Sequence, residues 1–178
     1  MILITGFGPF GEKGSVAHRE NPSEALANAA GEKLGARTEI LPVRFDIGEK
    51  VPELVSGADL VLSIGVAGGR TVPRLEKLGV NWQEARTADV TGLTPSGQKI
   101  FDDGPDFLAS GWDLDRIASE CGIEISLSAG TYVCNTLSYS LYRHHGNSCF
   151  LHIPPAEHLA LEEGVELVER IVECCMSA

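Results

Sequence analysis

Basic residues are scarce in this 178-residue sequence: 14 lysines and arginines compare with 25 acidic residues, which gives a net charge of −11. Because nucleic acids and anionic membranes bind local positive charge, neither is an expected partner. No stretch approaches the run of about 18 apolar residues that a transmembrane helix needs. Met1–Gly6 is apolar but short and lacks a basic segment, so we expect no signal peptide. These absences favour a globular protein of ordinary composition, with 43% hydrophobic and 22% charged residues.

Several familiar catalytic and ligand-binding motifs are also absent. The five cysteines form no C-x-x-C pair, so no metal site is expected, and their odd number indicates reduced thiols in a cytoplasm. No serine lies in a G-x-S-x-G nucleophile elbow, which leaves a serine hydrolase without support. The glycine-rich loop Gly65–Arg70 lacks the spacing and the lysine of a phosphate-binding loop. We expect this loop to present backbone N–H and C=O groups to a small amide-bearing ligand.

Segments typical of strands and of helices alternate along the whole chain. Asn21 is expected to cap the first helix, with Pro22 at its first position and Gly35 after its end. Strands are expected at residues 1–5, 38–43, 60–64 and 123–127, and a further strand is expected to end at His152. Helices are expected at residues 22–34, 47–55 and 114–121, after Cys134, and near 157–175. Residues 66–112 are expected to be largely irregular, with short strands near 78–82 and 98–101.

This order of elements predicts a single α/β domain over residues 1–178. Its three layers would place helices on both sides of a largely parallel mixed sheet, a layout similar to that of phosphorylases and hydrolases. In such sheets ligands bind at the carboxyl ends of the strands. Gly65, Gly130 and His152 all follow or end predicted strands, so we expect the functional site where these residues meet.

One cysteine and one histidine stand at positions suited to thiol chemistry. Cys134 lies where a small-residue loop leads from a strand into a helix, whose first N–H groups and dipole favour a thiolate. His152 lies farther along the chain, at the end of an apolar strand. These are the parts of a thiol hydrolase, although a buried structural cysteine has the same local pattern. Glu76, taken alone, is expected to be a solvated carboxylate.

Five motifs follow one another along nearly the whole chain: Thr5-Gly6-Phe7-x-Pro9-Phe10-Gly11, Asn21-Pro22-Ser23, Gly68-Gly69-Arg70, Ser128–Asn135 and His152-Ile153-Pro154. Together they resemble those of the pyroglutamyl peptidase I family of cysteine peptidases. The resemblance implies a cytoplasmic enzyme that removes the N-terminal pyroglutamyl residue from peptides, without a metal or a cofactor. It also implies a homo-oligomer, either a dimer or a tetramer.

The resemblance further implies roles for individual residues. Cys134 would be the nucleophile, His152 its base and later the acid, and Glu76 the residue that orients His152. Arg86 would lie near the thiolate and the oxyanion. Backbone N–H groups around Gly130 and Cys134 would complete the oxyanion hole.

The same resemblance implies which residues surround the pyrrolidone ring. Side chains at four positions would wall it: Phe7, Phe10, Tyr132 and Val133. Val66, in the glycine-rich loop, would contribute its backbone to reading the lactam amide. Such an apolar slot suits a neutral lactam and excludes a free α-ammonium, whose burial without a partner is costly.

Two alternatives remain open at this stage. Thr87 takes the place of an aliphatic pocket residue, and Pro73–Leu75 also departs from the family pattern. The segment between His152 and the last helix is shorter than in typical members. These departures keep open a diverged protein of the same fold that binds, or hydrolyses, a different small N-acyl or lactam amide. A nucleoside phosphorylase-like enzyme is the other alternative, suggested by the layout and the glycine-rich loop.

Overall fold

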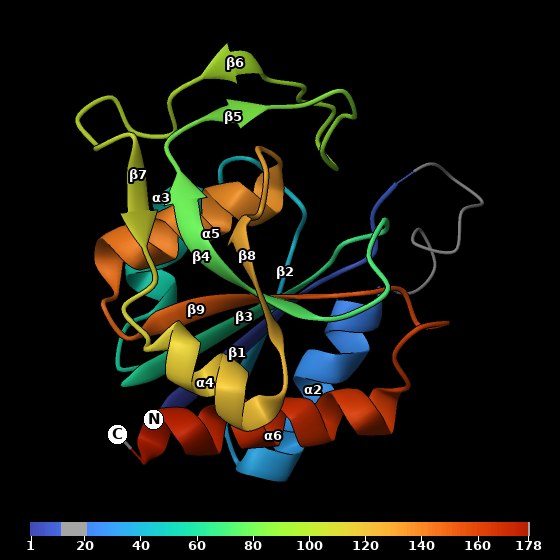
Figure 1. The fold of residues 1–178 in the computed structure, drawn as a ribbon. Helices are drawn as coiled ribbons and strands as arrows, with labels where there is room; N and C mark the ends of the chain where they lie inside the picture. The colour runs from blue at the N-terminus through green and yellow to red at the C-terminus, as the bar shows by residue number, and fades with distance from the viewer. Residues whose placement is uncertain (12–20, 178) are drawn as a thin grey trace.

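A mixed seven-stranded sheet between two layers of helices organises the computed structural model, which describes residues 1–11 and 21–177 (Figure 1). The strands of this sheet are β1 (Ile2–Phe7), β2 (Arg37–Leu41), β3 (Leu60–Val66), β4 (Arg74–Val80), β7 (Phe107–Ala109), β8 (Glu124–Ser128) and β9 (Ser148–Ile153). The helices are α2 (Pro22–Leu34), α3 (Ile47–Leu54), α4 (Leu114–Cys121), α5 (Val133–His144) and α6 (Leu161–Met176). A second, two-stranded sheet contains β5 (Gln83–Glu84) and β6 (Ser96–Gln98).

Most neighbouring strands of the large sheet run parallel. Strands β2, β1, β3 and β9 are parallel in that order, and β4 follows antiparallel to β9. Strand β4 also pairs with β8, which is parallel to it, and with β7, which is antiparallel. The predicted α/β fold with helices on both sides of a largely parallel sheet is confirmed.

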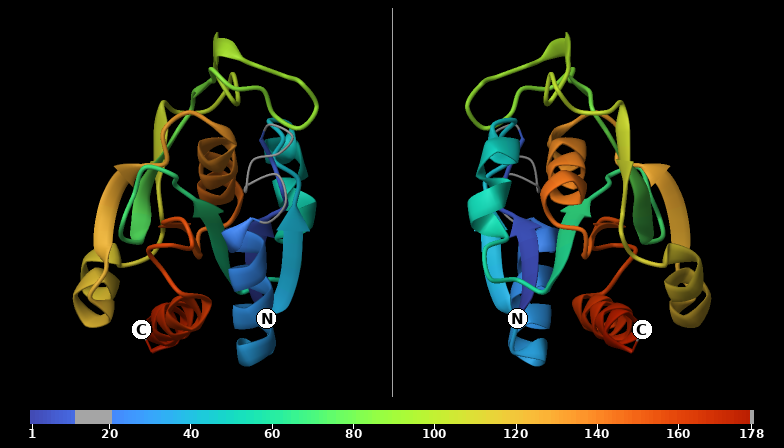
Figure 2. Two further views of the ribbon diagram at one scale, coloured as in Figure 1. Left: turned by 90° about the vertical axis from the view of Figure 1, so that its right-hand side faces the viewer. Right: turned by 90° about the vertical axis from the view of Figure 1, so that its left-hand side faces the viewer.

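Each face of the sheet has its own apolar core. Helices α2, α4 and α6 cover one face with residues such as Leu26, Ile117 and Val168, and α3 and α5 cover the other with Val51 and Leu137 (Figure 2). Each fully buried side chain of this kind contributes about 1.5–3 kcal/mol of transfer free energy. Within the described ranges, no helix is long and apolar enough to cross a membrane.

The predicted signals at the ends of α2 are confirmed. The Asn21 side chain accepts a hydrogen bond from the Ser23 N–H, Pro22 is the first helical residue, and Gly35 ends the helix in the left-handed region. Helix α6 begins at Leu161, later than the predicted start near residue 157. Val168 and Val172 of α6 are buried against the sheet, whereas Leu161 is exposed.

Strand β4 begins at Arg74, earlier than the short strand predicted near 78–82, and it is longer than expected in a segment predicted to be largely irregular. This seven-residue strand pairs with three other strands. Its sequence, Arg-Leu-Glu-Lys-Leu-Gly-Val, has three charged residues and a glycine, all of which lower strand propensity. Pairing within the sheet overrides that propensity. As a consequence Glu76 is fully buried, which corrects its expected place in solvent.

Candidate active site

Cys134 is the second residue of helix α5 and is partly buried. The loop that leads to it from β8 contains Gly130 with a φ of +83°, a backbone conformation that favours glycine. As the second helical residue, Cys134 has an N–H with no acceptor inside the helix. Its thiol therefore lies at the positive end of the helix dipole, where a thiolate is stabilised.

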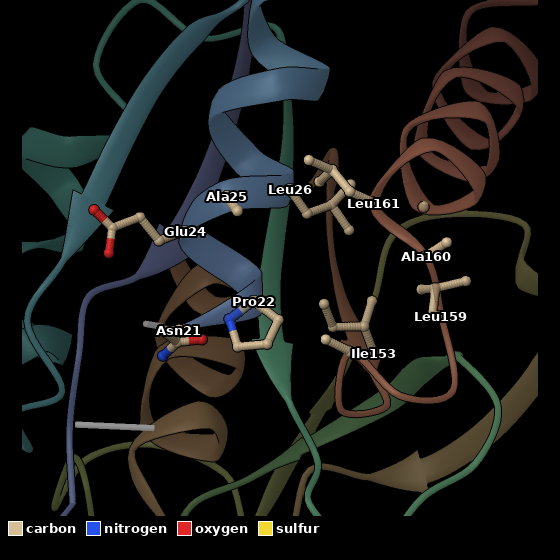
Figure 3. Close-up of a pocket in the computed structure, with 11 residues that line it drawn as sticks. Asn21, Pro22, Glu24, Ala25, Leu26, Ile153, Leu159, Ala160 and Leu161 are labelled. Atoms are coloured by element: carbon tan, nitrogen blue, oxygen red, sulfur yellow. The ribbon is translucent and has the colours of Figure 1, made fainter. Parts of the chain in front are cut away.

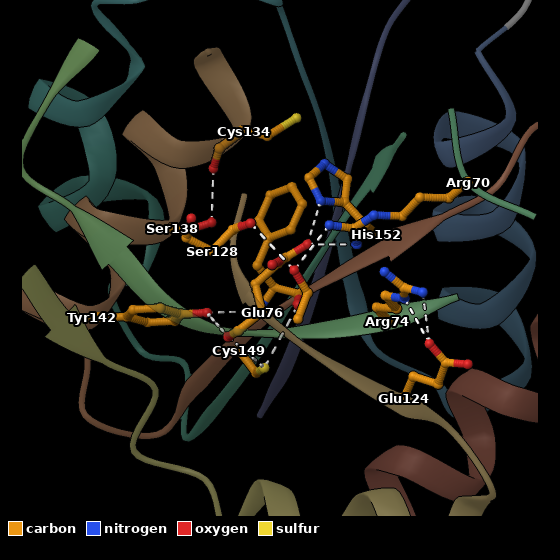
Figure 4. A network of polar contacts seen from close by, with 12 residues as sticks. Arg70, Arg74, Glu76, Glu124, Ser128, Cys134, Ser138, Tyr142, Cys149 and His152 are labelled. Carbon is orange, nitrogen blue, oxygen red and sulfur yellow. Dashed lines mark hydrogen bonds and ion pairs between the residues drawn. The ribbon is translucent and has the colours of Figure 1, made fainter. Parts of the chain in front are cut away.

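Glu76 and His152 meet although they are far apart in the sequence. The Glu76 Oε1 lies 2.7 Å from the His152 Nδ1, and both side chains are buried (Figure 4). Their strands, β4 and β9, are antiparallel neighbours, and Glu76 pairs with Phe150, two residues before His152. Residues two apart on a strand share one face, so the register of β4 and β9 brings the two side chains together on the face that α5 covers.

Neighbouring charges set the protonation of His152, and an aromatic ring packs against its imidazole. Burial lowers the pKa of His152, but the negative charges of Cys134 and Glu76 raise it more, to about 9. The Phe150 ring packs edge-on against the imidazole, with the ring centres 4.9 Å apart. An imidazole with this pKa is protonated at neutral pH, and a positive charge beside a sulfur is the arrangement that activates a nucleophilic cysteine.

The absence of a side chain at Gly65 makes room for the Cys134 sulfur. Gly65 pairs with His152 across β3 and β9. A Cβ at position 65 would lie 3.1 Å from the Cys134 Sγ and 2.8 Å from the Phe150 Cζ. A larger residue would therefore displace either the thiol or the aromatic support of His152.

A small cavity of about 50 Å³ lies beside the Cys134 thiol. Its lining is apolar except for one amide and the thiol, and consists of Phe7, Phe10, Asn21, Val43, Val66, Tyr132 and Cys134. Four of these positions were predicted to surround the ligand: Phe7, Phe10, Val66 and Tyr132. Val133, a fifth predicted position, is fully buried and packs in the core beneath α5.

A wider hollow adjoins the small cavity and shares Phe10 and Tyr132 with it. It has a volume of about 590 Å³, and the exposed residues Arg86 and Thr87 line it. Tyr132 is held in place from two sides, because its hydroxyl donates to the Ala88 carbonyl and its ring packs edge-on against Phe45. The two predicted residues Arg86 and Thr87 thus lie at the outer part of the site.

Another pocket, of about 410 Å³, lies between the first turns of α2 and α6 (Figure 3). Apolar residues such as Leu26, Leu159 and Leu161 line it together with Ile153. Ile153 directly follows His152 in β9, and successive strand residues point to opposite faces. This pocket therefore lies on the face of the sheet that is turned away from Cys134.

Three further side chains brace the site, and sequence reasoning assigned no role to them. Asn135 joins the start of α5 to the end of β4, because its side chain exchanges hydrogen bonds with the N–H and the carbonyl of Val80. The Tyr142 hydroxyl donates to the Glu76 carbonyl. Arg70 donates to the Glu76 carboxylate at 2.7 Å. Arg70 and Asn135 both belong to motifs noted in the sequence, but only the fold shows what they contact.

Among the described residues, no group of three or more His, Cys, Asp or Glu side chains could hold a metal ion. The chemistry that the described side chains support is nucleophilic attack by a thiolate, with a buried histidine to move protons.

The sequence profile of the family described as pyroglutamyl peptidase matches residues 1–164. Human pyroglutamyl-peptidase 1 is 33% identical over 171 residues, which cover 86% of this chain and 78% of that protein. The pyrrolidone-carboxylate peptidase of Thermococcus onnurineus is 31% identical over an alignment that covers 99% of both chains.

Two solved structures are similar over nearly their full length. Pyroglutamyl peptidase I from Bacillus amyloliquefaciens superposes with a TM-score of 0.86 at 28% identity and covers 99% of this chain and 95% of its own. Pyrrolidone carboxyl peptidase from Thermus thermophilus gives a TM-score of 0.81 at 34% identity and covers 99% and 98%.

Proposed function

Because this chain belongs to the pyroglutamyl peptidase family, we propose that it hydrolyses the amide bond that follows an N-terminal pyroglutamyl residue of a peptide. The observation that carries this proposal is the contact between the buried Glu76 and His152, beside a cysteine at a helix N-terminus. The profile match over residues 1–164 confirms the family that the sequence motifs resemble.

The first half of the reaction is an acyl transfer to the thiol. The Cys134 thiolate attacks the pyroglutamyl carbonyl carbon, a C–S bond forms, and the carbonyl oxygen becomes an oxyanion. The N–H groups at Cys134 and in the Gly130 loop are suited to stabilise that oxyanion. His152 then donates its Nε2 proton to the amine as the C–N bond breaks, which releases the shortened peptide and leaves a thioester.

The second half of the reaction is hydrolysis of the thioester. His152, now neutral, accepts a proton from a water molecule at its Nε2, and the hydroxide attacks the carbonyl. The C–S bond breaks, pyroglutamate leaves, and the thiolate–imidazolium pair forms again. Throughout both steps Glu76 accepts the Nδ1–H hydrogen bond and so fixes which imidazole nitrogen faces the substrate.

The cavity beside the thiol supports the choice of a neutral lactam ring as substrate. Phe7, Phe10, Val66 and Tyr132 offer apolar contact on several sides of a small space next to the sulfur. A free α-ammonium would lose its hydration there without gaining a counterion, so unblocked peptides would bind poorly. We assign the wider hollow, with Arg86 and Thr87, to the approach of the scissile carbonyl and to the leaving peptide.

The proposal extends to how the protein is organised. We propose that residues 1–178 form one catalytic domain and that copies of it assemble into a dimer or a tetramer in the cytoplasm. The five cysteines are all free, which suits a reducing compartment. Light scattering on the purified protein tests the assembly, and a monomeric mass at micromolar concentration would contradict it.

The experiment that tests the function is release of coumarin from an L-pyroglutamyl coumarin amide. Wild type should turn over, and Cys134→Ala should lose at least about a thousandfold in kcat. Cys174→Ala, which removes a partly exposed thiol from α6, is the matched control and should retain activity. A folded wild type without turnover would favour the diverged protein that binds, or hydrolyses, another small amide.

A further inference from the structure

Arg70 contacts the carboxylate that holds His152. The Arg70 Nη1 donates to the Glu76 Oε1 at 2.7 Å, and this same oxygen lies 2.7 Å from the His152 Nδ1. The Arg70 Nη2 donates to the Ser126 Oγ at 2.9 Å, on the strand next to β4. A guanidinium and an imidazole therefore share one buried oxygen (Figure 4).

The surroundings of Glu76 make its charge depend on these neighbours. Its side chain is fully buried, and within the described part of the chain its Oε2 has no hydrogen-bond partner. Burial raises the pKa of Glu76, but contacts with His152, Ser126 and Arg70 outweigh it and hold the pKa below its usual range. A buried carboxylate that loses its positive neighbours takes up a proton instead of staying charged.

The two positive neighbours differ in how long they stay charged. A guanidinium remains protonated at every pH that a protein survives. The imidazole is positive in the free enzyme but neutral once it has given its Nε2 proton to the leaving amine. At that point Cys134 is also neutral, because its sulfur is part of the thioester. Arg70 is then the cation that remains in contact with Glu76.

We propose that Arg70 is a positioning residue, which keeps Glu76 ionised and the His152 Nε2 free of a proton while the acyl-enzyme awaits hydrolysis. This inference rests on the proposed peptidase function. Without the Arg70 charge, the Glu76–His152 pair takes up one proton from water. If that proton goes to the imidazole, the Nε2 carries a hydrogen and no longer accepts one from the attacking water. If it goes to the carboxyl, the neutral Glu76 no longer stabilises the positive charge that His152 gains when it accepts a proton. Hydrolysis of the thioester slows, whereas formation of the thioester still proceeds from the thiolate–imidazolium pair.

The test is stopped-flow release of coumarin from an L-pyroglutamyl coumarin amide by wild type and Arg70→Met. We expect Arg70→Met to lower kcat by about tenfold to a hundredfold and to lower KM, with a fast first turnover before a slow steady state. Arg70→Lys retains a positive charge and should recover most of kcat. Arg74→Met is the matched control, because Arg74 pairs with Glu124 at the same distance of 2.7 Å on the neighbouring strands.

Two results would overturn the role of Arg70. One is an Arg70→Met enzyme whose kcat lies within about twofold of Arg74→Met, and the other is a loss of kcat without a fast first turnover. Arg70→Gln keeps hydrogen-bond donors without the charge, so a kcat equal to that of Arg70→Lys overturns the electrostatic role even where Arg70→Met does not fold. A wild type that releases no coumarin would instead refute the proposed function and leave Arg70 as a structural ion pair.

Discussion

Two arginine–carboxylate pairs lie on the β4–β8 side of the sheet and differ mainly in burial. Arg70–Glu76 and Arg74–Glu124 have the same nitrogen–oxygen distance, 2.7 Å. The Glu76 side chain is 0% exposed, however, and the Glu124 side chain is 59% exposed. Water screens the exposed pair, so it contributes about 0–1 kcal/mol at most. In the buried pair the same contact affects the protonation of the Glu76 carboxyl and of the His152 imidazole that it holds. Catalysis depends on the protonation states of these two groups.

The register of β4 and β8 explains why the buried pair draws its cation from a loop. Arg74 lies directly across from Glu124, so that pair forms within the two strands themselves. Glu76 lies across from Ser126, which is neutral. The cation for Glu76 comes from Arg70, after the glycines that follow β3. A loop can place a guanidinium over a buried carboxylate without burying the guanidinium itself, since the Arg70 side chain stays partly exposed.

The largest expected difference between the two pairs is in turnover. Glu76→Gln should lower kcat/KM by about a hundredfold to ten-thousandfold, because an amide neither fixes the imidazole tautomer nor stabilises the imidazolium. Glu124→Gln should stay within about twofold of wild type, since its charge is screened. Hydrolysis of the coumarin amide by both variants, with circular dichroism as the check on folding, measures the difference. Equal activities in the two variants would show that burial does not distinguish these carboxylates.

The sequence was sufficient to predict the part of the site whose signals are local. Cys134 follows a small-residue loop, and His152 ends a continuous apolar strand, so their positions in α5 and β9 could be anticipated. Glu76 carried no such signal. Charged residues lie near it at positions 74 and 77, and what buries it is the pairing of β4 with strands whose sequences lie far away along the chain. Its catalytic assignment therefore depended on resemblance to a family, and its burial became evident only in the fold.

The contact of Arg70 could not be read from the sequence for a related reason. Gly68-Gly69-Arg70 was recognised as a motif, but a loop residue six positions before Glu76 has no fixed direction until the sheet sets the strand ends. Val133 shows the opposite case. It lies in the most recognisable motif of the chain, yet its side chain points into the core, because it is the first residue of α5 and faces the sheet.

The pH dependence of activity gives a second difference between the two pairs. The pKa of His152 is raised to about 9, so kcat/KM should fall on the alkaline side as the pH passes through about 9. Glu76→Gln removes one of the negative charges that raise this pKa, and the alkaline limb should move to lower pH. Glu124→Gln should leave the limb in place. A profile of kcat/KM from about pH 6 to 10 measures the shift, and identical limbs in both variants would contradict the assignment.

The same pKa shift predicts how stability changes with pH. The folded-state pKa of His152 lies above its unfolded value of 6.5, so its contribution to stability is fully present below about pH 6.5. That contribution is lost as the pH rises through about 9. Urea unfolding of wild type and His152→Gln at several pH values isolates it. We expect the advantage of wild type to shrink between pH 6.5 and 9, and a constant advantage would contradict the raised pKa.

The smallest expected difference is in the free energy of unfolding at neutral pH. Breaking a buried ion pair by removing one partner typically costs about 3–5 kcal/mol. Glu76→Ala should cost less, about 1–3 kcal/mol, because His152 can release its proton and Arg70 is partly exposed to water. Glu124→Ala should cost less than about 1 kcal/mol, and that cost should largely vanish in 1 M salt, where the Debye length is only about 3 Å. Urea unfolding at low and high salt measures the loss in the free energy of unfolding for each variant. A loss for Glu76→Ala that falls with salt as much as the loss for Glu124→Ala would mean that water reaches Glu76 as freely as it reaches Glu124.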